Sequence, residues 1–286
     1  MKRIIYSIYV DIHAKEHYGK SKNRNDTVEK ATITVDAFKK HYNRLVESKK
    51  DYADSIGVPF KMYEYDDQYK TFAKNFLKDF PELTGYEVIN FYKIHILCEL
   101  AKDYDEILYL DFDAIPLTDE SFFDAWDLLK GICVLDNNDN VVTDLRVNHS
   151  IRSPTAKYFN CHAMLVDGGY HPANDVINTG IIGANAEHIK KLDYFGGFEH
   201  IIELMSALRS DAYAETGMYP QNIIDMFRYD NETIFSYKLQ VNNIDVQWLD
   251  DVWHYFFDKQ RFIPAKTKIV HAICKDFDCV WRRLDA

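Results

Sequence analysis

The sequence predicts an α/β protein in which helices flank a mainly parallel sheet. Short apolar runs alternate with segments of helical periodicity along the first half of the chain, as in strands joined by helical crossovers. One unbroken apolar run, Ile107 to Leu110, is followed at once by two aspartates. The chain has 286 residues, of which 47% are hydrophobic and 28% charged, which is enough for one large α/β domain or two smaller ones.

Three predicted strands alternate with helices in the first half of the chain. Arg3 to Asp11 begins with an apolar run that is typical of a buried strand. Asp26 and Glu29 are spaced as a helix N-cap and its capping-box partner, and apolar residues follow at helical spacing until Gly57. The other elements expected here are a strand at 58–65, helices at about 68–78 and 84–104, and a strand at 107–110.

The second half predicts further strands and helices around a long polar loop. A strand at 176–184 is interrupted by Gly180, and a glycine inside a strand often marks the close approach of a ligand or of another backbone. The other expected elements are a helix from Asp119 or Ser121 to Lys130, a strand at 131–135, a polar loop at 136–157, a helix at 198–208, a helix led by Asp230, an aromatic stretch at 247–257 and a strand at 268–273.

Two aspartates after the strand at 107–110 are the main functional signal. Side chains at i and i+2 of an extended chain point to the same side, so Asp111 and Asp113 are expected to converge. Ligands of open α/β sheets bind beyond the carboxyl ends of strands, and paired carboxylates favour a divalent cation. The structural alternative is a solvated strand end that begins a turn. The same spacing recurs at 103/105 and 276/278, but not after a buried-strand run.

Charge and composition exclude several classes of function. The net charge of −11, without a dense stripe of Lys or Arg, argues against broad binding to nucleic acid or to an anionic membrane surface. The 5 cysteines fit no zinc-binding spacing, so we expect reduced thiols in a reducing compartment. The sequence contains no signal-peptide pattern and no apolar run of about 18 residues, and therefore predicts a soluble, cytoplasmic protein.

Four segments carry a family resemblance: the helix and Asp-x-Asp strand from Lys93 to Leu117, Asn178-Thr-Gly-Ile-Ile, Asp230-Asn-Glu-Thr, and Ile269-Val-His-Ala-Ile. Together they resemble GT-A glycosyltransferases, most of all the glycogenin and galactosyltransferase-like group called family 8, in the order of that family. The late motif departs from the family, which continues from the histidine to Gly and Lys-Pro-Trp, whereas this chain continues Ala-Ile-Cys to Lys275. The short N-terminal half resembles viral or bacterial enzymes that act on surface glycans.

The resemblance implies a GT-A (Rossmann-like) fold, with a mixed, mainly parallel sheet flanked by helices, as a single domain over 1–286. Residues 1–135 would mainly bind the nucleotide, and 136–286 the donor sugar and acceptor. The implied activity is retaining, metal-dependent transfer of a sugar from a UDP-sugar, or alternatively a GDP-sugar, to a glycan or other hydroxyl. A departing diphosphate gains negative charge, which Mn²⁺ or Mg²⁺ would neutralise. Expected partners are therefore the donor and a glycan acceptor, without nucleic acid or a membrane span.

The resemblance also implies the site residues. Asp111, Asp113 and His271 would bind the metal ion. The expected donor contacts are Tyr9 and Asp11 at the base, Lys93 and Lys275 at the phosphates, Asp111 at the ribose, and Asn178 and Gly180 at the sugar. Glu232, with Asp230 as its substitute, would be the catalytic carboxylate that stabilises oxocarbenium-like charge.

Each assignment has a structural alternative. His271 would otherwise be a buried strand histidine with a satisfied hydrogen bond, and Glu232 an acid that favours a helix N-terminus. The further alternatives are a solvated helix-face lysine for Lys93, strand-end packing for Tyr9 and Asp11, and a β-bulge for Asn178 and Gly180. Acceptor contacts are open for Trp248, Trp253 and Tyr255, where core packing is the better expectation, and for His162, Asp167 and His171.

Two other functions compete with the glycosyltransferase. In a haloacid-dehalogenase-like Mg²⁺-dependent phosphatase, Asp111 would be the nucleophile, Asp113 the acid/base, and Asp250 with Asp251 the late acidic pair. That motif usually opens the chain and continues Gly-Thr, whereas here it continues Ala-Ile. The third possibility is a protein that binds a nucleotide-sugar without turnover.

Overall fold

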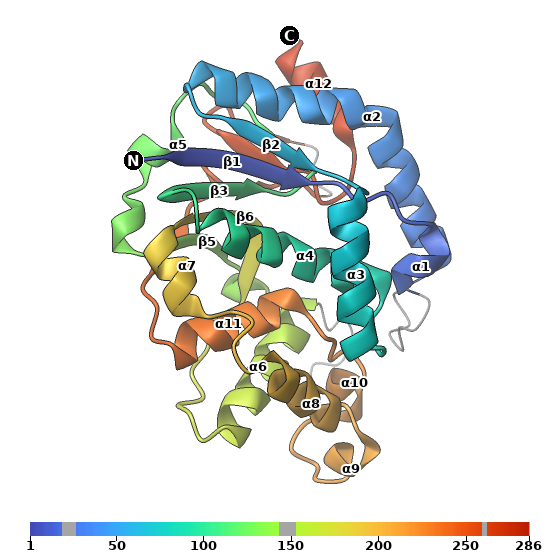
Figure 1. The fold of residues 1–286 in the computed structure, drawn as a ribbon. Coiled ribbons are helices and arrows are strands. Elements are labelled where there is room, and N and C mark those ends of the chain that lie inside the picture. The colour runs from blue at the N-terminus through green and yellow to red at the C-terminus, as the bar shows by residue number, and fades with distance from the viewer. Residues whose placement is uncertain (19–26, 143–152, 259–261, 286) are drawn as a thin grey trace.

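The computed structural model describes residues 1–18, 27–142, 153–258 and 262–285, and it shows a six-stranded sheet with helices on both faces (Figure 1). The strand order is β2-β1-β3-β6-β5-β7. These strands span Phe60–Tyr63 (β2), Arg3–Ile8 (β1), Glu106–Leu110 (β3), Ile177–Asn185 (β6), Ile132–Asp136 (β5) and Val246–Leu249 (β7). β1 is parallel to β2 and β3, and β5 is parallel to β7, whereas β6 is antiparallel to β3 and β5. The expected α/β class with a mixed, mainly parallel sheet is confirmed.

A second, three-stranded sheet lies beside the end of β3. It has the order β4-β9-β8, with β4 at Ala114–Pro116, β9 at Ile269–His271 and β8 at Tyr255–Phe256. β9 is antiparallel to β4 and pairs Ala114 with His271. This small sheet therefore brings the late histidine next to the segment that follows the two aspartates.

The helices form two layers. They span Ala14–Tyr18 (α1), Val28–Ser55 (α2), Asp67–Asp79 (α3), Gly85–Leu100 (α4), Phe122–Ala125 (α5), Ser153–Asp167 (α6), Ala186–Leu192 (α7), Phe198–Leu208 (α8), Asp211–Ala214 (α9), Gln221–Ile224 (α10), Asn231–Val241 (α11) and Phe277–Leu284 (α12). Helices α4, α6, α8 and α11 pack on one face of the large sheet, whereas α2 covers the other face and carries α12 (Figure 1).

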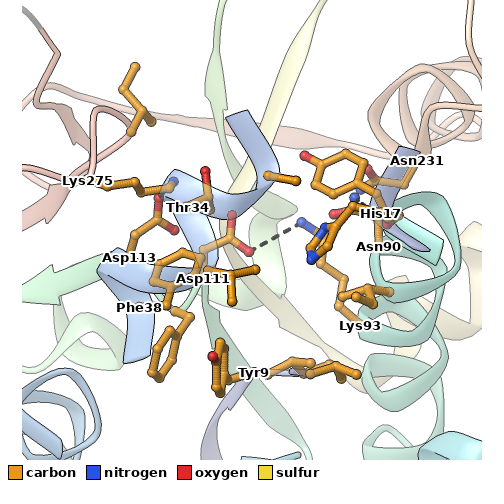
Figure 2. Close-up of a pocket in the computed structure, with 18 of the residues that line it drawn as sticks. Tyr9, His17, Thr34, Phe38, Asn90, Lys93, Asp111, Asp113, Asn231 and Lys275 are labelled. Carbon is orange, nitrogen blue, oxygen red and sulfur yellow. Dashed lines mark hydrogen bonds and ion pairs between the residues drawn. The ribbon is translucent and has the colours of Figure 1, made fainter. Parts of the chain in front are cut away.

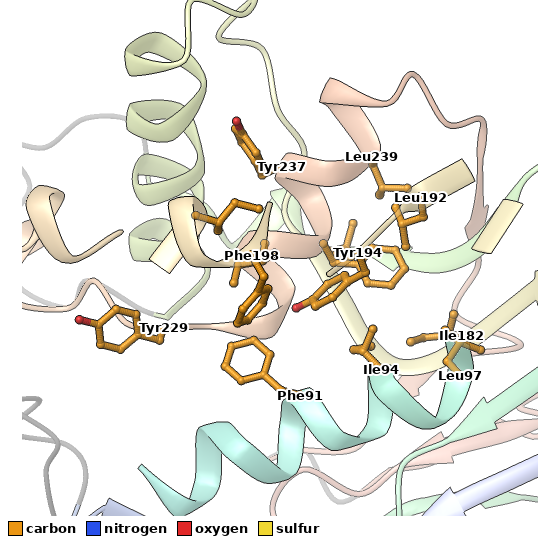
Figure 3. Packing of buried hydrophobic residues seen from close by; sticks show 14 of the residues in the cluster. Phe91, Ile94, Leu97, Ile182, Leu192, Tyr194, Phe198, Tyr229, Tyr237 and Leu239 are labelled. Carbon is orange, nitrogen blue, oxygen red and sulfur yellow. The ribbon is translucent and has the colours of Figure 1, made fainter. Parts of the chain in front are cut away.

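The largest core surrounds α4, as Figure 3 shows. Phe91, Ile94 and Leu97 of this helix face Tyr194, Phe198 and Ile182. Each such side chain contributes roughly 1.5–3 kcal/mol when it is fully buried. Thr84 and Glu87 close the N-terminus of α4 with a capping box, which fixes where the helix begins. The core thus holds α4, and with it the buried Lys93, rigidly against the sheet.

Several predicted elements need correction. The helix expected from 119 or 121 to Lys130 is only α5 followed by a 3₁₀ turn at Leu128–Lys130, because Trp126 takes an extended conformation between them. The loop expected at 136–157 is wrong from Ser153 onward, where α6 begins, and 143–152 lies outside the described residues. Asp26, the expected cap of α2, also lies outside them, and Thr27 is the N-cap.

The other predicted helices and strands are present, with ends displaced by a few residues. The single-domain organisation stays a prediction, and both halves of the chain supply strands to the large sheet. None of the described helices combines the length and the apolar character that crossing a bilayer requires.

Candidate active site

One cavity of about 380 Å³ collects the predicted site residues beyond the ends of β1 and β3 (Figure 2). Its lining includes Tyr9, Asp11, Lys93, Asp111, Asp113, Asn178, Asp230, Glu232, His271 and Lys275. Gly180 lies directly behind this lining, because a Cβ atom there would be 2.3 Å from Cε1 of His271. Its amide donates to Oδ1 of Asn178 at 2.9 Å. The fold therefore brings residues from both halves of the chain to one place, and their roles remain predictions.

The two aspartates and the histidine form a compact cluster. Nε2 of His271 lies 3.7 Å from Oδ2 of Asp111 and 3.5 Å from Oδ2 of Asp113. One potential ligand atom from each of the three residues lies within 4.8 Å of the others. Carboxylate oxygens with one imidazole nitrogen suit Mn²⁺, and the oxygens also suit Mg²⁺. The residues therefore fit the expected metal ion.

A turn, and not an extended strand, makes the two carboxylates converge. The amide of Ala114 donates to the carbonyl of Asp111 at 2.9 Å, which closes a tight turn immediately after β3. The amide of Asp111 in turn donates to the carbonyl of Gly180 at 2.7 Å. The i, i+2 argument from an extended chain was therefore wrong in its geometry. Its result, two carboxylates facing one cavity, holds.

Two lysines already neutralise the carboxylates. Lys275 forms an ion pair with Asp113, and Nζ of Lys93 lies 3.5 Å from Oδ1 of Asp111 (Figure 2). Tyr109 donates its hydroxyl to the same oxygen of Asp111. Burial alone would raise the pKa of Asp113, but Lys275 and His271 hold it well below its usual range. Asp113 is therefore ionised at neutral pH and able to hold a cation.

Two buried basic residues behind the cluster were not predicted from the sequence. Lys49 of α2 is completely buried and donates to the carbonyl of Phe112, between the two aspartates, at 2.9 Å. His254 is completely buried as well, and its Nε2 lies 3.0 Å from Nδ1 of His271. Burial, followed by the neighbouring His271, lowers the pKa of His254 well below its usual value. Neither residue stands in a recognisable motif, so only the tertiary contacts reveal them.

The buried position of Lys49 predicts a pH-dependent stability. Burial lowers the pKa of its ammonium to about 7, even though Asp113 and Asp111 oppose this shift. Between pH 7 and about 10.4 the unfolded chain holds more protons at this residue than the folded chain does. The free energy of unfolding of the wild type should therefore rise with pH relative to Lys49→Met over this window. Urea unfolding from pH 7 to 9.5 in EDTA measures this difference.

The control for this prediction is Lys50→Met, because Lys50 is the neighbouring residue on α2 and is exposed. Its difference from the wild type should not change with pH. If the difference in free energy of unfolding between Lys49→Met and the wild type also stays constant with pH, burial does not lower the pKa of Lys49.

Glu232 also lines the cavity, and both of its carboxylate oxygens are engaged. Oε1 accepts from the amide of Thr179 at 2.7 Å and from Nδ2 of Asn178 at 3.1 Å, and Oε2 pairs with Lys157. Burial alone would raise the pKa of Glu232, but Lys157 and Lys93 lower it. Burial alone would lower the pKa of Lys157, but Asp230 and Glu232 raise it to about 12. Lys157 was missed because it falls in the segment predicted as loop.

Asp230 is the N-cap of α11. Its Oδ1 accepts from the amides of Glu232 and Thr233 at 3.0 and 3.1 Å, and its Oδ2 lies 3.6 Å from Lys157. Asp230 and Glu232 therefore both lie at a helix N-terminus, which was the structural alternative for Glu232. Both residues also line the cavity.

The third part of the cavity is aromatic. Tyr9 stacks on Phe112 with ring centroids 4.6 Å apart, so one face of Tyr9 is already covered. Asp11 pairs with Lys39 at 3.1 Å near the surface. The residues considered for acceptor contacts, Trp248, Trp253, Tyr255, His162, Asp167 and His171, are not among the lining residues, and Trp253 packs in the core as expected.

No protein-family model matches the sequence, and no curated protein matches it. Among solved structures, a glycosyltransferase involved in glycosylating the major capsid of PBCV-1 is 14% identical, with a TM-score of 0.45 over 98% of this chain and 100% of that one. Mouse xyloside xylosyltransferase 1 is 9% identical, with a TM-score of 0.43 over 96% and 98%. The galactosyltransferase LgtC, in complex with donor and acceptor sugar analogues, is 11% identical, with a TM-score of 0.41 over 94% and 87%. The function proposed below depends on the residues of this site and not on these similarities.

Proposed function

We propose that this protein is a GT-A-type, metal-dependent glycosyltransferase that moves a sugar from a nucleotide-sugar to a hydroxyl of a glycan acceptor. One observation carries the proposal: a single cavity combines two carboxylates, one imidazole and two lysines with a polar pocket around Glu232. A nucleotide-sugar presents a diphosphate, which needs cations, next to a sugar, which needs polar contacts. A UDP-sugar is the default donor, and a GDP-sugar is the alternative.

The diphosphate would bind at the carboxylate cluster. Asp111, Asp113 and His271 would hold Mn²⁺ or Mg²⁺, which when bound supplies Lewis-acid stabilisation of the leaving diphosphate. Lys93 and Lys275 contact the same two carboxylates, so their ammonium groups would lie near a diphosphate that binds at this cluster and could donate to its oxygens. Lys275 can act in this way although the residues before it depart from the family motif.

The sugar would bind between the cluster and α11. Asn178 and Gly180 would contact its hydroxyls, and the ionised Glu232 would stabilise the positive charge that develops at the anomeric carbon. A carboxylate placed in this way supports transfer with retention. Asp230 holds the N-terminus of α11, and Lys157 fixes both acids, so we assign to Lys157 a positioning role.

The phosphatase is the weaker candidate. Its late acidic pair would have to be Asp250 and Asp251, yet neither is among the residues that line the cavity. Oδ1 of Asp250 instead accepts from the amides of Val252 and Trp253 at 3.0 Å, in a turn that follows β7.

The test of the proposed function is a thermal unfolding series with UDP, GDP and other nucleotides, with and without Mn²⁺, followed by turnover of the matching nucleotide-sugars. A ligand present at 100 times its Kd adds about 2.7 kcal/mol of stability, which is a readily visible shift. We expect a shift with UDP or GDP that requires Mn²⁺. A shift without sugar transfer or hydrolysis would indicate a binding protein, and hydrolysis of generic phosphate esters without any nucleotide shift would indicate the phosphatase.

The ion pair between Lys275 and Asp113 predicts opposite effects of one substitution. In the free protein Lys275 neutralises the carboxylate that a metal ion would use, so Lys275→Met should bind Mn²⁺ alone more tightly. The same change removes a charged donor to the diphosphate, so UDP should bind roughly 10–100-fold more weakly in the presence of saturating Mn²⁺. Titration calorimetry measures both affinities. A variant in which the two affinities change in the same direction would contradict this dual role.

A further inference from the structure

The aromatic stretch 247–257 places a second histidine behind the metal cluster. His254 lies in the turn between β7 and β8, where its amide donates to the carbonyl of Asp250 at 2.9 Å. Its ring is 0% exposed, and its Nε2 lies 3.0 Å from Nδ1 of His271. At this distance one of the two ring nitrogens donates a hydrogen bond to the other, and which one donates depends on the tautomer of each ring.

The ring of His271 has little freedom to turn. Gly180 lies against its edge, since a Cβ atom at Gly180 would be 2.3 Å from Cε1 and 2.5 Å from Nδ1. The ring of Phe256 lies 5.5 Å away, centroid to centroid. Nδ1 of His271 therefore stays directed at His254, and Nε2 stays directed at Asp111 and Asp113.

The proton positions follow from this geometry. To ligate a cation, Nε2 of His271 needs its lone pair, so Nδ1 carries the proton and donates to Nε2 of His254. His254 then carries its own proton on Nδ1, an atom that has no hydrogen-bond partner among the described residues.

We propose that His254 is a positioning residue: its Nε2 accepts from Nδ1–H of His271 and so keeps Nε2 of His271 free to ligate a divalent cation. This inference rests on the metal site of the proposed function. The N–H of a cation-bound imidazole is the more polarised donor, and hydrogen bonds that involve a charged partner are about twice as strong as neutral ones. His254 satisfies that donor and leaves the weaker, neutral N–H of its own ring unpaired. A nonpolar residue at position 254 would leave the polarised N–H of His271 unpaired instead.

The first measurement is Mn²⁺ affinity, read from the electron paramagnetic resonance signal of free Mn²⁺ in titrations of the full chain without nucleotide. His254→Phe keeps a ring but removes the hydrogen bond, and it should weaken Mn²⁺ binding roughly 10–100-fold. In His254→Gln the side-chain oxygen can accept from Nδ1 of His271, so the affinity should return to within about threefold of the wild type. The control is Trp253→Phe, which alters buried packing next door without touching His271 and should bind Mn²⁺ normally.

The second measurement locates the protons in the wild type, so it does not depend on a variant that folds. Nitrogen-15 correlation spectra of the histidine rings, recorded without metal and with diamagnetic Mg²⁺, show which ring nitrogen carries hydrogen. With saturating Mg²⁺ we expect hydrogen on Nδ1 of His271 and no hydrogen on Nε2 of His254. Hydrogen on Nε2 of His254 at saturating Mg²⁺, or a His254→Phe variant with wild-type Mn²⁺ affinity, would overturn the proposal.

The failure of this inference can be told from the failure of the metal site itself. His271→Ala should lose Mn²⁺ binding if the site is correct. If His271→Ala loses it while His254→Phe binds Mn²⁺ as the wild type does, only the role of His254 is wrong. If His271→Ala binds Mn²⁺ as the wild type does, the metal site is wrong, and the role of His254 is wrong with it.

Discussion

Asp113→Asn should lower the rate of sugar transfer by about a thousandfold and remove most of the Mn²⁺ affinity. Asp113 is buried, ionised and shared by His271 and Lys275, so the amide replaces the most enclosed charged ligand of the cluster. A cation that neutralises a leaving diphosphate contributes several kcal/mol at the transition state, and each 1.36 kcal/mol is about tenfold in rate. Initial rates at saturating Mn²⁺ and donor, together with a Mn²⁺ titration, measure the effect.

The chain offers a matched control for this variant. Asp103 belongs to another Asp-x-Asp pair, but it is exposed and lies outside the lining of the cavity. Asp103→Asn should therefore keep wild-type rate and Mn²⁺ affinity, and both variants should retain their fold in thermal unfolding. If folded Asp113→Asn retains metal-dependent transfer, Asp113 is not a metal ligand, and the assignment of the cluster is wrong.

Glu232→Gln should lower transfer by about 100-fold, and it should also destabilise the protein. The glutamine removes the charge that we place beside the anomeric carbon, and a lost electrostatic contact of this kind costs roughly 10²–10³ in rate. The same change deprives Lys157 of its nearest carboxylate, and among the described residues Asp230 then remains at 3.6 Å. Breaking a mostly buried ion pair on one side costs about 3 kcal/mol. Steady-state kinetics and urea unfolding report the two effects separately.

A double variant distinguishes catalysis from structure. Lys157→Met combined with Glu232→Gln removes both charges and should recover much of the stability that Glu232→Gln loses. If Glu232 stabilises charge on the sugar, the double variant stays slow although it is stable. Near wild-type rates in the double variant would show that Glu232 has no catalytic role and only holds Asn178 and Thr179 in place. Glu187→Gln, which removes an exposed acid from the first turn of α7, should change neither quantity.

Local patterns in the sequence were sufficient to predict the strand and the helix that carry Asp111 and Lys93. The apolar run before Asp111 predicts β3, and the helix predicted from residue 84 is α4. The three potential metal ligands could be named because two of them follow a recognisable strand and the third lies in a motif of the resembling family. Their convergence through a turn could not be predicted, since the hydrogen bond from Ala114 to Asp111 follows from how β4 pairs with β9.

The residues that support the predicted site, Lys49, Lys157 and His254, could not be predicted, because each depends on contacts with residues far away in the sequence. Lys49 sits on a long, largely exposed helix, where a lysine usually faces water, and only the packing of α2 on the turn after β3 buries it. Lys157 follows a polar stretch that gave no sign of the helix α6. His254 stood among aromatic residues for which core packing was the better expectation and acceptor contact the alternative, whereas in the structure its ring contacts His271.

The pairing of β9 with β4 has a consequence for the order in which the protein is assembled. During synthesis the chain leaves the ribosome from its N-terminus, so both aspartates emerge well before His271. A nascent chain that has formed β3 exposes two carboxylates without their imidazole. The full set of three ligands exists only after β9 has docked on β4, which pairs Ala114 with His271. Tight cation binding would therefore require the late strand β9, and its stabilisation would be added only after β9 has docked on β4.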